Sequence, residues 1–178
     1  MTGRGIDQIL PHPAPPVLFE SYMRSALGYV ELAERSSGPI PRPVDDAYIW
    51  GDALPELARI RPDLRIINLE TAVTLSGDAE PGKGIHYRMH PANVGCLSAA
   101  AIDCCVLANN HVLDWGYSGL SETVDTLRRA GIATAGAGCD AAAAAAPAVL
   151  LAPGKGRVLV FACGMRSEER RVGKECRL

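Results

Sequence analysis

The chain has 178 residues, enough for one domain with a substantial buried core, and two full catalytic domains are not expected. Its 48% hydrophobic and 21% charged residues are typical of a folded globular protein, which excludes intrinsic disorder for most of the length. Lysine and arginine number 18 against 20 aspartates and glutamates, so the formal charge of -2 provides no basic field for nucleic acid or an anionic membrane.

No transmembrane segment is predicted. Residues 141–153 are uncharged and mostly alanine, and Pro147 interrupts them. This uncharged stretch is shorter than the roughly 20 apolar residues that span a bilayer. The first residues include Arg4 and Asp7 and lack the apolar stretch of a signal peptide. As written, the sequence is therefore expected to stay in the cytoplasm.

The six cysteines show no C-x-x-C spacing. A reducing compartment does not favour a disulfide framework, so we interpret them as small buried hydrophobic residues. A metal–thiolate site is the alternative, although structural zinc sites prefer paired spacing.

The first third of the chain is predicted to contain two helices. Residues 11–16 and 39–43 are proline-rich, and apolar side chains between them recur at intervals of three and four. This spacing predicts an amphipathic helix over residues 19–33. A second short helix is predicted over residues 52–60, and Pro62 follows its end.

From residue 64 onward, short apolar runs alternate with helical patterns. The predicted elements are strands at 64–69, 102–108 and 132–135, helices at 93–101, 120–130 and 140–146, and a hairpin of 148–151 with 157–163. Alternating strands and helices predict an α/β fold with a mostly parallel sheet.

Polar side chains follow two of the predicted strands. Glu70 comes directly after the strand at 64–69, and the strand at 102–108 is followed by Asn109, Asn110, His111 and Asp114. Ligands of open α/β sheets bind at the carboxyl ends of the strands. Carboxylate and amide oxygens are hard ligands for a divalent cation, and an imidazole can donate a proton to a leaving oxygen. The alternative is that the asparagines only cap a turn and the histidine packs nearby.

A second group of candidates has an alternating pattern. His86, Arg88 and His90 are two residues apart, and if residues 85–90 are extended all three face one way. We predict that they bind a phosphate or another polyanionic substrate, with Asn109 as a further contact. Exposed polar packing is the alternative interpretation.

A weaker nucleotide-binding hypothesis comes from Gly136-x-Gly138-x-x-Ala141, which follows a predicted strand and opens a predicted helix. The next strands do not end in the acidic residue that such a site uses.

Three strings of residues resemble one known family. They are Asn68-Leu69-Glu70-Thr71, Tyr87-Arg88-Met89-His90-Pro91, and Leu107-Ala108-Asn109-Asn110-His111 continuing through Asp114 to Gly116. In this order they resemble the CapA family of poly-γ-glutamate capsule biosynthesis proteins, which are similar to calcineurin-like metallophosphoesterases. The resemblance implies an incomplete metallophosphoesterase-like α/β sandwich over residues 1–165.

The resemblance also implies a site for two divalent metal ions. Glu70 would bridge the ions and Asn110 would bind one of them. His111 would contact the scissile phosphate and assist its leaving group, and Asp114 would orient His111 or fix the loop. The two ions would activate a water for in-line attack on a phosphorylated substrate.

Two departures from the family pattern bear on activity. The family carries a metal-binding aspartate on its first strand, which is missing before Gly3, and no histidine follows His111. We therefore expect this 178-residue chain to be inactive. Its parent protein is expected to be a metal-dependent phosphoesterase of capsule or poly-γ-glutamate biosynthesis. The alternative is a non-catalytic assembly or export factor that uses the same fold as a binding surface.

The character of the sequence changes near its end. Residues 166–178 are strongly charged and resemble one reading frame of a sequencing-library adapter. We expect them to be a non-native tail. A solvated native tail is the alternative.

Overall fold

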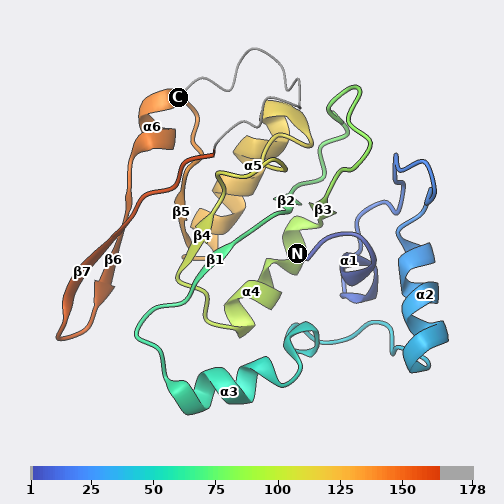
Figure 1. Ribbon diagram of the computed structural model, residues 1–178, viewed down its shortest axis with the longest axis horizontal. Helices are drawn as coiled ribbons and strands as arrows, with labels where there is room; N and C mark the ends of the chain where they lie inside the picture. Colours follow the sequence, from blue (N-terminus) through green and yellow to red (C-terminus); the bar gives the residue numbers. More distant parts are fainter. Residues whose placement is uncertain (1, 165–178) are drawn as a thin grey trace.

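The computed structural model describes residues 2–164 (Figure 1). Met1 and residues 165–178, which include Cys176 and the predicted non-native tail, lie outside the described residues.

In chain order, the helices and strands are divided into a first group that ends at Met89 and a second that begins at Pro91. The first consists of α1 (Gly5–Ile9), α2 (Leu27–Ser37), η1 (Tyr48–Trp50), α3 (Ala53–Ile60), β1 (Ile66–Asn68), β2 (Ala72–Val73) and β3 (Arg88–Met89). The second consists of η2 (Pro91–Val94), α4 (Gly95–Ala99), β4 (Cys104–Val106), α5 (Gly116–Arg129), β5 (Ala133–Ala135), α6 (Ala141–Ala145), β6 (Ala148–Ala152) and β7 (Gly156–Val160).

Within residues 2–164, the strands form one central sheet and two smaller pairs. The central sheet has the order β1-β4-β5, and both of its pairings are parallel. β2 and β3 form a second parallel pair, whereas β6 and β7 form an antiparallel hairpin that extends away from the rest of the chain in Figure 1. The predicted α/β fold with a mostly parallel sheet is confirmed.

The main core lies between the central sheet, the β2–β3 pair and the helices α4 and α5. Helix α5 packs against β2 and β5. Val73, Met89, Leu97 and Leu127 are fully buried in this core. Burial of a side chain of this kind stabilises the fold by about 1.5–3 kcal/mol. The core thereby holds the two parallel sheets in fixed positions.

Most predicted elements are present with shifted ends. Asp140 caps α6, because its carboxylate accepts a hydrogen bond from the Ala143 N–H at 2.7 Å. The structure adds α1, β2 and β3, which are too short to leave a periodic pattern in the sequence. None of the helices within residues 2–164 is both long and apolar enough to cross a bilayer.

The predicted helix over residues 19–33 is wrong in its first half. Helix α2 begins at Leu27, and Val17 and Ser25 form an isolated antiparallel bridge before it. Phe19 is 44% exposed, and its ring lies edge-on to the His86 ring at 5.0 Å. The apolar spacing fits a helix locally, but tertiary contacts decide the conformation here.

The cysteines divide into two groups. Cys96, Cys104 and Cys105 are buried as predicted, and burial raises the pKa of the Cys96 and Cys105 thiols to about 12. These two thiols therefore stay protonated at neutral pH and behave as small apolar groups. The prediction of burial is wrong for Cys139 and Cys163, which are exposed.

Asp7 connects the N-terminal segment to the rest of the fold. Its buried carboxylate accepts hydrogen bonds from the Ala14 N–H at 2.7 Å, the His90 N–H at 2.9 Å and the Asn93 side-chain amide at 2.8 Å. Burial raises the pKa of the Asp7 carboxyl, and these hydrogen bonds oppose that rise. The carboxylate thus links α1 to the segment that leads out of β3.

We expect Asp7→Asn to lower the free energy of unfolding by about 1–3 kcal/mol, because an amide can no longer accept hydrogen bonds on both sides. Chemical denaturation followed by circular dichroism measures the change. Asp125→Asn is the matched control, since Asp125 pairs with Arg128 at the exposed surface of α5 and should change stability by less than about 0.5 kcal/mol. Equal stability of the two variants would contradict the role given to Asp7.

Candidate functional site

The carboxyl ends of β1 and β4 lie side by side. Asn68 is opposite Val106 in the parallel register, and the Leu69 N–H extends the pairing by donating to the Val106 carbonyl at 3.0 Å. Glu70 follows β1, and Asn110 follows β4. The two predicted metal ligands therefore leave neighbouring strands at one edge of the sheet, as expected from the sequence.

Asn109 ties the two strand ends together. Its Nδ2 donates to Asn68 Oδ1 at 3.0 Å and to the Leu69 carbonyl at 3.1 Å, while its Oδ1 accepts from the His111 N–H at 3.0 Å. Asn68 in turn donates to Glu70 Oε1 at 3.3 Å. The Asn109 amide is thus engaged in shaping the edge, and its substrate contact stays a prediction.

His111 and Asp114 form a buried pair beside this edge. His111 Nδ1 lies 2.8 Å from Asp114 Oδ2, so Asp114 is in place to orient the ring, as predicted. The Tyr87 ring stacks on the imidazole with centroids 4.0 Å apart and an angle of 25°. His111 is only 7% exposed. A histidine that meets substrate at a strand end is expected from the sequence to be partly exposed in the cleft. This expectation is wrong for His111, because Tyr87 covers one face of the ring.

Asp114 is fully buried, yet both of its oxygens have partners. Oδ2 also accepts the Tyr87 N–H at 2.6 Å, and Oδ1 forms an ion pair with Lys83. The same lysine ammonium donates to the Asn110 carbonyl. Buried carboxylates require such partners, and here one carboxylate joins the loop after β4 to the segment before β3.

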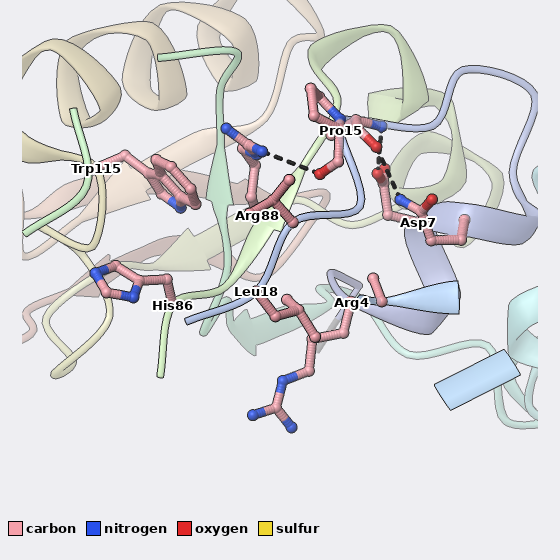
Figure 2. A pocket seen from close by; sticks show the side chains of 11 residues that line it. Arg4, Asp7, Pro15, Leu18, His86, Arg88 and Trp115 are labelled. Carbon is pink, nitrogen blue, oxygen red and sulfur yellow. Dashed lines mark hydrogen bonds between the residues drawn. The ribbon is translucent and has the colours of Figure 1, made fainter. Parts of the chain in front are cut away.

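His86 and Arg88 contact the same aromatic side chain. The Arg88 guanidinium lies over the Trp115 ring at 3.9 Å and donates to the Pro15 carbonyl at 3.0 Å (Figure 2). It also donates to the Ser76 carbonyl at 3.1 Å. The His86 ring lies 5.6 Å from the Trp115 ring, and its Nε2 is 3.0 Å from the Glu80 carbonyl. Both residues line a small pocket next to the N-terminal segment.

His90 does not share that surface. Its Nδ1 accepts the Ala92 N–H at 3.0 Å and caps η2. Only Arg88 and Met89 of the predicted extended stretch form a strand. The expectation that residues 86, 88 and 90 present one common face is therefore wrong, because the chain turns into η2 directly after β3. Their roles in substrate binding stay predictions.

The donors at the strand ends fit only part of a metal site. Glu70 is partly exposed and Asn110 is exposed, so both are accessible to an ion. Across residues 2–164, however, His, Cys, Asp and Glu side chains do not gather in a group of three or more that could hold a metal. The described residues do not by themselves make the two-metal site that the sequence implies.

A comparison with known protein families identifies the family of this chain. The family model for bacterial capsule synthesis proteins, PGA_cap, matches residues 1–177. The chain belongs to the PGA_cap family. This membership confirms the resemblance to CapA proteins and the metallophosphoesterase-like fold class.

The curated relatives of this chain are longer than the chain itself. A Mycobacterium tuberculosis H37Rv protein named "probable polyglutamine synthesis accessory protein" is 51% identical over 160 residues, which are 90% of this chain and 42% of that protein. A protein of Sinorhizobium fredii named as uncharacterized is 34% identical over 106 residues, 57% of this chain and 23% of that protein. The chain thus spans less than half the length of these relatives.

Two residues of the site, Lys83 and Tyr87, are not predicted from the sequence. Lys83 lies in a glycine-rich turn that gives no sign of its contacts, which reach across 27 residues to Asn110 and 31 to Asp114. Tyr87 belongs to one of the family strings, which marks the segment but not its stacking on His111.

We expect Asn109→Ala to lower the free energy of unfolding by about 1–3 kcal/mol, because it leaves the Leu69 carbonyl and the His111 N–H without their partner. Asn110→Ala is the matched control one residue away, because Asn110 is exposed and its contact with Lys83 uses the main-chain carbonyl. Thermal and chemical denaturation compare the two. If both variants lose the same stability, the tie between the strand ends is not due to the Asn109 amide.

Proposed function

We propose that the protein acts in the synthesis of a glutamyl polymer of the bacterial capsule and binds an anionic, phosphorylated substrate at the carboxyl edge of the β1-β4-β5 sheet. Membership of the PGA_cap family supports the capsule assignment. The name of the 51% identical relative, a probable polyglutamine synthesis accessory protein, supports a glutamyl polymer.

The single observation that carries the site is the arrangement of the loop after β4. One carboxylate, Asp114, holds the Nδ1 side of His111, which leaves Nε2 as the ring nitrogen for a substrate. A histidine oriented by a carboxylate is suited to donate a proton to a leaving oxygen. The amide of Asn109 fixes the backbone of the same loop against β1.

Catalysis by a metal-dependent phosphoesterase is our proposal for the whole protein. Glu70 and Asn110 are the residues of this chain that would contact a divalent ion, since carboxylate and amide oxygens are suitable donors. A bound pair of ions would neutralise charge on the phosphoryl oxygens. The chain's own contribution is to hold His111 in one orientation beside those donors.

A second candidate is a non-catalytic assembly or export factor that uses the same edge as a binding surface. The observation that favours it is the burial of His111, whose ring is stacked on Tyr87 and whose Nδ1 is engaged. A histidine packed in this way can serve binding without proton transfer.

A deletion strain tests the proposed function. The gene encoding this sequence is removed and replaced by the wild-type, His111→Ala or Lys155→Gln form, and the glutamyl polymer is measured by acid hydrolysis and amino-acid analysis. Lys155 pairs with Asp63 at the surface and serves as the control. We expect the deletion and His111→Ala to abolish the polymer, whereas Lys155→Gln restores it. Normal polymer in the deletion strain would contradict the proposal.

Assays of the protein purified from the same gene distinguish a phosphoesterase from a non-catalytic assembly or export factor. Hydrolysis of a phosphomonoester and a phosphodiester is measured with added manganese, iron or zinc. For an enzyme, we expect His111→Ala to lower turnover by about 100-fold or more. Absence of turnover in a protein that restores the polymer would favour the assembly factor.

A further inference from the structure

We propose that Lys83 is an anion-binding residue of the strand-edge site and that it contacts an oxyanion of the substrate together with His111. This inference rests on the proposed function, because it names a further residue of the same site. Lys83 contacts the Asn110 carbonyl and Asp114.

The placement of Lys83 is not explained by packing of its own loop. A side chain at either neighbour, Gly82 or Gly84, would face open space. Nevertheless the Lys83 ammonium reaches the loop after β4, and the Glu80 N–H donates to the Asp114 carbonyl at 3.0 Å. The segment before β3 is therefore anchored over the site by polar contacts.

The ammonium retains a donor for a ligand. A lysine carries three N–H donors, of which one goes to Asn110 and one to Asp114. The Lys83 side chain is 23% exposed, whereas Asp114 is fully buried beneath it. The remaining N–H is consequently the donor that can face solvent or substrate.

Lys83 and His111 are separated by one carboxylate. The Lys83 ammonium donates to Oδ1 of Asp114, and His111 Nδ1 is hydrogen-bonded to Oδ2. The Lys83 ammonium and the His111 ring are thus held by one buried carboxylate. An anion is expected to favour the charged ammonium, because hydrogen bonds between charged partners are stronger than neutral ones. Two anchoring contacts also restrict the side chain before the anion arrives, which reduces the entropic cost of binding.

The experiment measures binding of inorganic phosphate and of a short γ-glutamyl oligomer to the 178-residue chain by calorimetry and NMR titration. Lys83→Gln is the main variant, because it removes the charge and keeps a polar side chain with N–H donors. Lys83→Arg keeps the charge, Lys155→Gln removes an exposed lysine elsewhere, and His111→Ala reports on the site itself. Circular dichroism verifies that each variant is folded.

We expect Lys83→Gln to weaken binding of the anion by roughly tenfold, as for loss of a hydrogen bond to a charged group. Lys83→Arg should stay within about twofold, Lys155→Gln should not change binding, and added salt should weaken binding by the wild type. A stronger effect with phosphate identifies a phosphorylated substrate, and a stronger effect with the oligomer identifies carboxylates of the polymer.

Two results would overturn the inference, and they are distinguishable. If Lys83→Gln binds as the wild type while His111→Ala does not, Lys83 only neutralises Asp114 and the proposed site stands. If the wild type binds neither probe, or His111→Ala binds both unchanged, the proposed site fails together with this inference.

Discussion

The buried carboxylate of Asp114 is the interaction on which the candidate site depends. A carboxylate removed from water must be compensated by hydrogen bonds or opposite charge. Here the compensation comes from the Tyr87 N–H, the His111 ring and the Lys83 ammonium. Two segments far apart in the chain are therefore held together at one point, and the orientation of His111 follows from that requirement.

The parallel sheet provides the second constraint. Pairing of β1 with β4 brings Glu70 and the loop after β4 to the same edge, but pairing alone does not fix the loop. The Asn109 amide does so by bonding to Asn68 and to the Leu69 carbonyl. The core beneath the sheet sets the strand positions, and the polar contacts above it set the side chains. Together they fix the loop after β4 against the end of β1.

Elements that depend on a local sequence pattern could be predicted. Side-chain positions that depend on contacts between distant residues could not. Alternating strands and helices predicted the parallel sheet, and the order of the strand-end residues predicted that Glu70 and Asn110 leave adjacent strands. The alternating spacing of His86 and His90 led to a wrong prediction of a common face. The chain turns into η2 after β3, and His90 caps that helix. Lys83 could not be found from the sequence, since a lysine between two glycines is typical of any exposed turn.

A crystal structure of the protein soaked with inorganic phosphate or grown with a γ-glutamyl oligomer tests the central claim most directly. The account predicts that an anionic group lies within hydrogen-bond distance of His111 Nε2 and Lys83 Nζ, with Asp114 still bonded to both residues. An anion bound away from the carboxyl ends of β1 and β4, with the His111 ring still covered and making no contact to it, would contradict the account.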